Sequence, residues 1–264
     1  MKEVAPRGAS AAGRGARDRI FHGDCIEGMA AMKESSVDLI VTDPPFAIGF
    51  GARRANYNRK EGNVMDGYNE ITPAEYPGFT GRWMAGAHRV LKETGSMFVF
   101  SGWTNLQDIL RAIDETGFKT INHIIWRYQF GVYTKRRFVS SHYHCLYVCK
   151  NDKKRRFYTE SRHSDTKSRY RDMEDVWVIN REYWSGKKKT PTKLPGELIR
   201  KILQYSSREG DLVMDPFLGS GQVAVVSKEM GRRYAGFEIV REYYDFALER
   251  LGARGRAKGA GPAP

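Results

Sequence analysis

Cysteine is scarce in this sequence, and long apolar runs are missing. The chain of 264 residues has three cysteines, Cys25, Cys145 and Cys149, an odd and sparse set that argues against a disulfide framework and agrees with a reducing compartment. No stretch approaches the ~18 consecutive apolar residues of a membrane span, and the basic start at Met1 lacks the apolar segment of a signal peptide. We therefore predict a cytoplasmic protein that does not cross a membrane.

A metal-ligand pattern is also lacking. His142 and His144 stand close to Cys145 and Cys149, and the four could be imagined as ligands. They belong, however, to an alternating apolar run that predicts a buried strand. We interpret them as strand residues and predict no metal site.

Negative charge is in the minority. Lys and Arg number 44 against 31 acidic residues, which gives a formal charge of +13 and a pI near 9.6. Such an excess suits a polyanionic partner, with a membrane surface as the competing interpretation. Because 41% of the residues are hydrophobic, the chain can bury a sizeable core.

We expect one domain at residues 18–251, between two basic tails at residues 1–17 and 252–264 that are rich in Gly, Ala and Arg and should be mobile. Within the domain, short apolar runs alternate with helical patterns, which favours an α/β fold with a doubly wound, mostly parallel sheet. We expect strands at residues 37–41, 96–100, 121–126, 142–149, 212–214 and 234–237, and helices at residues 77–92, 106–115, 194–205, 222–230 and 243–251.

The expected strand at residues 212–214 runs into a glycine-containing turn that opens a helix. In a doubly wound sheet, this arrangement lets the backbone approach a nucleoside ligand. Glu238 ends the next strand, 23 residues beyond Asp215, where a carboxylate can accept hydrogen bonds from ribose hydroxyls. Gly219 and Gly221 do not continue into the G-x-G-x-x-G spacing of a dinucleotide site, which argues against a nicotinamide cofactor. A simple tight turn remains an alternative.

The strand at residues 37–41 ends in Asp43-Pro44-Pro45-Phe46. An exocyclic amine on a base is a poor nucleophile, because its lone pair is delocalised into the ring. Asp43 and the carbonyl of Pro44 can accept its two N–H groups and favour a pyramidal nitrogen, while Phe46 stacks on the base. The prolines fix the direction of the carbonyl and offer no competing amide hydrogen. A simple strand ending is the alternative.

These two segments together resemble the amino-methyltransferases of DNA, whose acceptor motif is D/N/S-P-P-Y/F/W and whose cofactor motif is D-P-F-x-G-S-G. Here the second motif reads Asp215-Pro216-Phe217-Leu218-Gly219-Ser220-Gly221, and the resemblance extends from about residue 20 to residue 251. It implies a Rossmann-like methyltransferase fold with S-adenosylmethionine as the cofactor. The acceptor motif comes first, as in the beta-type order, which implies a target-recognition insertion at about residues 151–189.

Two further segments are similar to family elements. Gly23-Asp24-Cys25 resembles the segment that holds the adenine of the cofactor, with Asp24 as the acceptor for its amino group. Residues 190–195 resemble the H-P-T-Q-K-P element beside the methionine moiety, which implies cofactor contacts for Thr192 and Lys193. The His, Gln and Lys of that element are replaced here by Thr190, Lys193 and Leu194. The resemblance assigns the cofactor site to Asp24, Cys25, Thr192, Lys193, Asp215, Phe217, Gly219, Ser220, Gly221 and Glu238.

Two basic segments are candidates for DNA contact. The first is a long loop at residues 49–67, with Arg53, Arg54, Arg59 and Lys60. The second begins at residue 150, is interleaved with aromatic residues and contains Lys153, Lys154, Arg155 and Arg156. Phosphate contacts from both would offset the cost of extruding a base from the duplex. A solvated charged surface is the alternative for the second segment.

The function predicted from these features is site-specific methylation of double-stranded DNA at adenine N6. The flipped base would stack on Phe46 and attack the sulfonium methyl in line, with no covalent protein intermediate. An aspartate at position 43 is typical of adenine N6 enzymes, and cytosine N4 is the near alternative. Methylation of RNA or protein and a non-catalytic nucleic-acid-binding protein are more distant ones. The resembled type is compatible with a homodimer and with a cognate restriction endonuclease.

Overall fold

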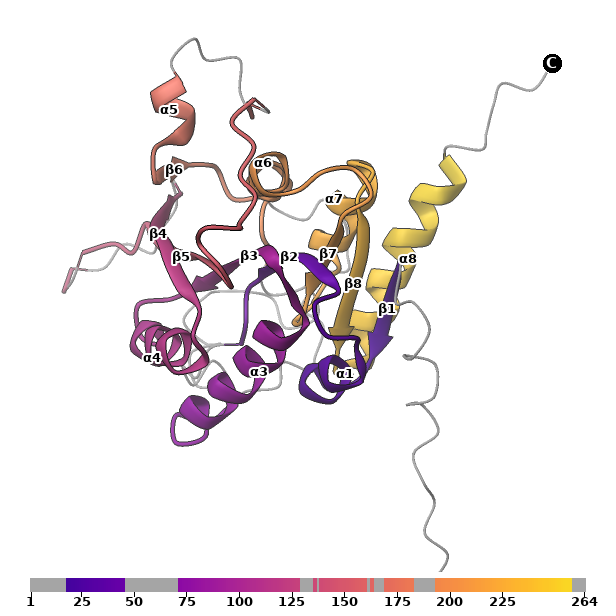
Figure 1. The fold of residues 1–264 in the computed structure, drawn as a ribbon, viewed down its shortest axis with the longest axis horizontal. Helices are drawn as coiled ribbons and strands as arrows, with labels where there is room; N and C mark the ends of the chain where they lie inside the picture. Colours follow the sequence, from indigo (N-terminus) through magenta and orange to yellow (C-terminus); the bar gives the residue numbers. More distant parts are fainter. Residues whose placement is uncertain are drawn as a thin grey trace, which may run out of the picture.

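The computed structural model describes residues 18–45, 71–128, 135–136, 138–160, 162–163, 169–182 and 193–257, built on a central sheet (Figure 1). Its strands are β1 (Arg19–His22), β2 (Val37–Thr42), β3 (Leu91–Ser101), β4 (Lys119–Arg127), β5 (His142–Cys149), β6 (Val176–Val178), β7 (Leu212–Asp215) and β8 (Arg233–Glu238). They pair in the order β1-β8-β7-β2-β3-β5-β4-β6, and within the described residues only β5 is antiparallel to its neighbours. The expected mostly parallel α/β fold is confirmed.

Helices cover both faces of this sheet (Figure 1). The helices are α1 (Cys25–Ala31), α3 (Tyr76–Val90), α4 (Leu106–Thr116), α5 (Arg169–Met173), α6 (Gly196–Ser206), α7 (Gln222–Glu229) and α8 (Arg241–Ala257). One apolar cluster joins α1, α3 and α4 to one face, a second joins α6 and α7 to the other, and a third packs α8 against β1 and β8. The doubly wound arrangement follows. Among the described helices, none has the length and apolar character that a membrane crossing requires.

Strand β2 shows how the sequence directs this packing. All its residues are buried; Leu39 and Val41 pack in the cluster of α6 and α7, while Ile40 packs in that of α1 and α3. A strand covered on both faces needs a continuous apolar run, and each such side chain contributes roughly 1.5–3 kcal/mol of burial free energy. The strand ends before Pro44 and Pro45, which cannot donate to the ladder.

Several element boundaries differ from the prediction. Leu91 is the first residue of β3 rather than part of a helix ending at 92, because it pairs with Val37 before the register shifts and Leu39 pairs with Ser96. Helix α8 continues to Ala257, beyond the expected end at residue 251. Strands β1 and β6 and helices α1 and α5 were not predicted, since they are short and carry little periodic apolar pattern.

Candidate active site

Four acidic side chains follow one another along the edge of the sheet where parallel strands end. Glu238 and Asp215 are the last residues of β8 and β7, Asp43 follows β2, and Asp24 lies two residues beyond β1. These strands are neighbours in the order β1-β8-β7-β2. Neighbouring strands lie about 4.8 Å apart, so the acidic row spans roughly 15 Å. An extended ligand with cationic groups fits such a row.

Glu238 is buried beside two glycines. Its Oε2 accepts a hydrogen bond from Gly219 N at 2.7 Å, and its Oε1 accepts one from Val240 N at 2.8 Å. Gly23 N donates to the main-chain oxygen of Glu238 at 2.9 Å. A Cβ at Gly23 would meet no atom within 4 Å, and one at Gly219 would meet only a carbonyl oxygen at 4.0 Å. There is thus open space at both glycines, as a close approach of the backbone to a ligand requires.

Asp215 links the glycine turn at residues 215–221 to the end of β2. Its Oδ1 accepts hydrogen bonds from Thr42 Oγ1 at 2.9 Å and from Phe217 N at 3.0 Å. Burial raises its pKa to about 7; these two hydrogen bonds oppose the shift, and the charge of Glu238 adds to it. Thr42 was not singled out from the sequence, although it immediately precedes Asp43.

The other residues of the turn have structural contacts. Gly221 has φ +75°, and a Cβ there would lie 2.9 Å from Ala247 Cβ, so this glycine permits close packing of α8. Phe217 packs against Trp83 with ring centroids 5.4 Å apart. Ser220 is buried, and its carbonyl accepts a hydrogen bond from Arg250. Phe217 and Gly221 shape the turn, whereas Gly219 leaves it open.

Asp43 stands at the acceptor end of the row, followed by the buried Pro44. Its surroundings raise its pKa to about 7, first through desolvation and second through the charge of Asp215, while the positive charge of Arg181 opposes both. A carboxyl group with this pKa can release and recover a proton near neutral pH. Phe46, the predicted stacking residue, lies outside the described residues.

An aromatic wall lies next to this acceptor end, on the neighbouring strands. Trp126 is the hub: its ring centroid lies 6.2 Å from Phe100, 5.5 Å from Tyr128 and 5.8 Å from Tyr143. Arg181 covers Tyr128, with its guanidinium carbon 4.0 Å from the ring centroid. The sequence does not reveal this wall, because its residues come together only through the order β2-β3-β5-β4. Phe100, Trp126 and Tyr128 are buried, so the wall is part of the apolar core beside the strand end that carries Asp43.

Two residues predicted to hold the adenine of the cofactor are placed at the start of α1. Asp24 is the N-cap of this helix, and its Oδ1 accepts from Ile26 N at 2.6 Å and from Glu27 N at 3.4 Å. The Cys25 side chain is buried, which raises the pKa of its thiol well above the ordinary value. A cofactor contact at Cys25 would therefore involve its backbone more readily than a thiolate.

Lys193 is already paired. Its Nζ lies 2.5 Å from Glu182 Oε1, while Glu182 Oε2 accepts from Gly196 N at 2.7 Å, at the first turn of α6. Gln222 Nε2 also approaches this carboxylate, at 3.4 Å. Glu182 was not predicted from the sequence, because it lies in no segment that resembles a known motif. Thr192 lies outside the described residues.

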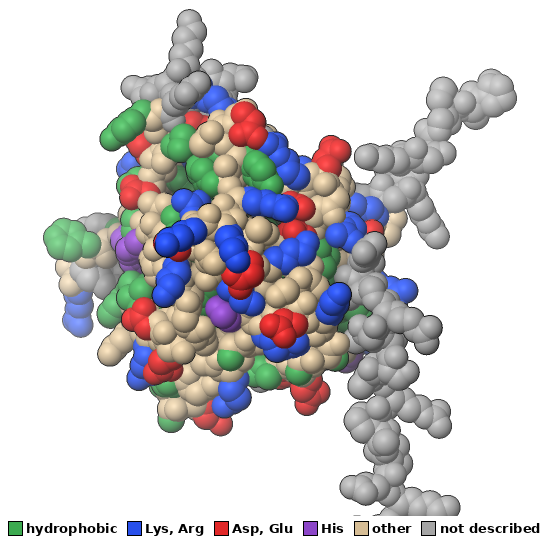
Figure 2. Space-filling view, in the orientation of Figure 1, with side chains coloured by type: hydrophobic (Ala, Val, Ile, Leu, Met, Phe, Trp, Pro, Cys, Tyr) green, Lys and Arg blue, Asp and Glu red, His purple; other side chains and the backbone are tan. Residues whose placement is uncertain are grey.

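The structure places only the second group of candidate DNA-binding residues, and it does not bring that group to Asp43. Arg53, Arg54, Arg59 and Lys60 lie outside the described residues. Lys153, Lys154, Arg155 and Arg156 follow β5, which runs antiparallel to β3, so they lie near the amino end of β3 rather than at the acceptor edge. Figure 2 shows basic side chains spread over the visible face with acidic ones among them. The described residues also contain no group of three or more His, Cys, Asp or Glu side chains placed to hold a metal ion.

Known proteins are similar to this chain in sequence and in fold. Residues 37–249 match the DNA methylase family of N6 and N4 enzymes. The Type II methyltransferase M2.DpnII of Streptococcus pneumoniae is 31% identical over 241 residues, covering 89% of each chain, and M2.LlaDCHI of Lactococcus lactis subsp. cremoris is 30% identical over 239 residues, covering 88% of each.

Solved structures agree. TTHA0409 of Thermus thermophilus, complexed with S-adenosyl-L-methionine, is 23% identical with a TM-score of 0.65, over 89% of this chain and 93% of the other. The cytosine-N4-specific PvuII DNA methyltransferase is 19% identical with a TM-score of 0.70, over 88% of this chain and 85% of the other. Together with the open glycine turn and the Asp-Pro-Pro strand end, the family match shows that this chain belongs to the N6/N4 family of S-adenosylmethionine-dependent DNA methyltransferases.

Proposed function

We propose that this protein methylates the N6 amino group of adenine in double-stranded DNA by direct transfer from S-adenosylmethionine. The observation that carries the proposal is the position of Asp43 at the end of the acidic row, one strand away from Asp215. A cofactor lying along β8 and β7 ends beside β2, where the acceptor carboxylate stands. A protein that only bound nucleic acid would need neither the row nor the open turn.

The cofactor supplies a methyl group on a sulfonium, which needs only a nucleophile in line. Asp43 accepts one N–H of the amine, and the main-chain oxygen of Pro44 accepts the other, so that the nitrogen lone pair is directed at the methyl carbon. The nitrogen forms the new bond to carbon, the carbon–sulfur bond breaks and its electron pair stays on sulfur. The amine then loses a proton, and Asp43, with a pKa of about 7, is able to receive it.

Apolar side chains would bind the extruded base, and basic side chains would bind the DNA backbone. We propose that Phe46 and the wall around Trp126 face the base, and that the loop with Arg53, Arg54, Arg59 and Lys60 contacts phosphate. Affinity for DNA should then fall steeply as salt rises. Adenine rather than cytosine is supported by the carboxylate at position 43, which is a stronger acceptor than a hydroxyl. The two relatives named Type II methyltransferases support a role in restriction–modification.

The test is a product assay with a matched control. Purified protein, unmodified genomic DNA and S-adenosylmethionine are incubated, and N6-methyladenine and N4-methylcytosine are quantified by mass spectrometry after digestion to nucleosides. Asp43→Ala should lower the rate by at least about 100-fold, since it removes a hydrogen-bond acceptor that acts on the reacting nitrogen. Asp114→Ala, an exposed aspartate on α4, should leave the rate unchanged.

The outcomes separate the alternatives. N6-methyladenine that disappears only in Asp43→Ala establishes the acceptor and its carboxylate together. N4-methylcytosine instead would keep the mechanism and reject adenine. If neither methylated base is found although calorimetry shows that the cofactor binds, RNA and protein become the substrates to examine.

A further inference from the structure

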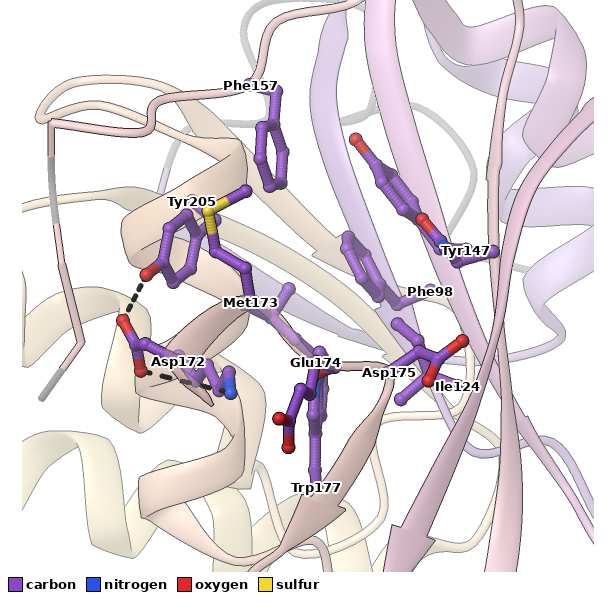
Figure 3. Close-up of a pocket in the computed structure, with 13 residues that line it drawn as sticks. Phe98, Ile124, Tyr147, Phe157, Asp172, Met173, Glu174, Asp175, Trp177 and Tyr205 are labelled. Atoms are coloured by element: carbon purple, nitrogen blue, oxygen red, sulfur yellow. Dashed lines mark hydrogen bonds and ion pairs between the residues drawn. The ribbon is translucent and has the colours of Figure 1, made fainter. Parts of the chain in front are cut away.

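Asp172 of α5 forms a buried contact with two residues of α6, ahead of β6 and the segment that follows it (Figure 3). Asp172 accepts a hydrogen bond from the hydroxyl of Tyr205, and its Oδ1 lies 4.0 Å from Lys201 Nζ. The same ammonium group lies 5.0 Å from the ring centroid of Trp177. Asp172 and Lys201 are only 4% and 8% exposed, so the pair fixes α5 and β6 against α6.

The chain stays fixed as it leaves β6. Trp126 Nε1 donates to the carbonyl of Ile179 at 2.8 Å, and Ile179 N donates to the last residue of β4 at 3.2 Å. Three residues later, Glu182 accepts from Gly196 N and pairs with Lys193. Arg181 lies between these two anchors, so its backbone is held at the carboxyl end of β4.

The guanidinium of Arg181 packs on the aromatic wall. It lies 4.0 Å from the ring centroid of Tyr128 and 5.5 Å from that of Tyr143. Tyr143 also has a side-chain hydrogen bond with Arg181, and it is close enough to Asp43 for that carboxyl to raise its pKa, which burial brings to about 12. Arg181, Tyr143 and Asp43 therefore form one cluster, although they come from three separate parts of the chain.

The carboxyl of Asp43 needs a counter-charge. In the part of the chain that the structure describes, the groups that interact electrostatically with it are Asp215 from β7, Tyr143 and Cys145 from β5, and Arg181. Burial and Asp215 favour its protonated form, whereas Arg181 favours the carboxylate. A protonated Asp43 would have less capacity to accept an N–H from the amine. Within the described residues, Arg181 is the cation among these groups.

We propose that Arg181 is a positioning residue that keeps Asp43 ionised and oriented for the acceptor amine, while its guanidinium closes the wall over Tyr128 and Tyr143. This inference rests on the proposed methyl transfer. The proposed site then has three parts: the two sequence motifs, and Arg181 from the segment that follows β6.

The test is the pH dependence of kcat/KM for DNA in the full-length protein. Its acidic limb reports an essential group of the free enzyme, here Asp43. In Arg181→Gln the limb should move to higher pH, and in Arg181→Lys it should return toward that of the unaltered protein. A rise of one unit lowers kcat/KM about tenfold on the acidic side while changing it little at high pH. Arg181→Met, which keeps the apolar stem, is a second charge-removing variant in case the glutamine variant does not fold.

Arg111→Gln is the matched control, because Arg111 is an exposed residue of α4 that pairs with Asp108 at 2.7 Å. An unmoved limb in the folded Arg181 variants, or an equal shift in Arg111→Gln, would overturn the proposal. A direct readout separates this result from failure of the proposed function. If the unaltered protein methylates no DNA, carbon-13 NMR of the Asp43 carboxyl still tests the inference: its pKa should be higher in Arg181→Gln, and an unchanged pKa would reject the role.

Discussion

The two ends of the central sheet carry charges that are used in different ways. At the carboxyl ends of β1, β8, β7 and β2, four acidic residues follow one another. The charge of Asp215 raises the pKa of Asp43, and the charge of Glu238 raises that of Asp215. At the opposite end, Lys154 lies 3.8 Å from Glu93 and Arg156 lies 3.9 Å from Asp211. Within the described ranges, no acidic residue of the first set forms an ion pair with a basic side chain, so this set is suited to a cationic ligand; the basic residues of the second set have acidic partners.

This difference shows that a charged run in a sequence has no fixed role until the strand order is known. Arg155, in the middle of the basic run, donates to the hydroxyl of Tyr147 at 2.9 Å and lies 5.6 Å from the ring centroid of Phe157. Its alkyl stem and charge are engaged with aromatic rings of the protein. The acidic row, in contrast, is scattered over more than 200 residues of sequence and is assembled only by the fold.

The largest expected effect concerns the two glycines at the acidic edge. Gly221→Ala places a Cβ 2.9 Å from Ala247 Cβ and imposes φ +75° on a residue with a side chain. The overpacking and the backbone strain should together lower the free energy of unfolding by about 2–4 kcal/mol. Urea denaturation followed by circular dichroism measures this loss.

Gly219→Ala is the matched comparison. It has φ +52° but open space around the added Cβ, so only the strain of about 1 kcal/mol should appear in the unfolding free energy. Its larger consequence should be weaker binding of S-adenosylmethionine, since the methyl group occupies the open space at Gly219, whose N donates to Glu238. Equal losses of stability in the two variants would contradict the assignment of different roles.

The next effect concerns charge at the acidic edge. Asp215→Asn keeps an oxygen that can accept from Thr42 Oγ1 and Phe217 N but removes a negative charge that would attract the cationic cofactor. S-adenosylmethionine should bind roughly ten- to a hundredfold more weakly, and the neutral sulfur product should be affected less. Calorimetry with both ligands measures the ratio. If both ligands weaken equally, Asp215 acts by shape and not by charge.

The same carboxyl groups predict how pH acts on the ligand-free protein. The folded pKa values of Asp43 and Asp215 are raised from 3.8 to about 7, so the folded state holds protons that the unfolded state has released. Stability should therefore fall as the pH rises from about 4 to about 7, while affinity for the cationic cofactor rises. Asp215→Asn should flatten the decrease in melting temperature over this window.

Much of this architecture could be predicted from the sequence, because some of its signals are local. The glycine turn after Asp215 and the prolines after Asp43 each lie within a few consecutive residues. Their steric and hydrogen-bonding requirements can therefore be recognised from the residue types alone. The wall around Trp126 and the position of Arg181 could not be predicted in this way. They depend on β5 running antiparallel to β3 and on β4 lying beyond it, and no short-range pattern specifies either the direction or the order of strands that are far apart in the sequence.

The smallest expected effect is the sharpest test of the contrast between the two ends. Lys153→Ala combined with Lys154→Ala removes two charges from the end of the sheet opposite Asp43, where Lys154 pairs with Glu93. DNA that reaches the acceptor edge should not contact this end, so affinity measured by fluorescence anisotropy at several salt concentrations should change less than about twofold. Each phosphate contact adds about 0.9 to the slope of log affinity against log salt, so an unchanged slope is the expected result. A slope reduced by about two would show that DNA wraps around to the amino end of β3, and the basic run would then be part of the DNA interface after all.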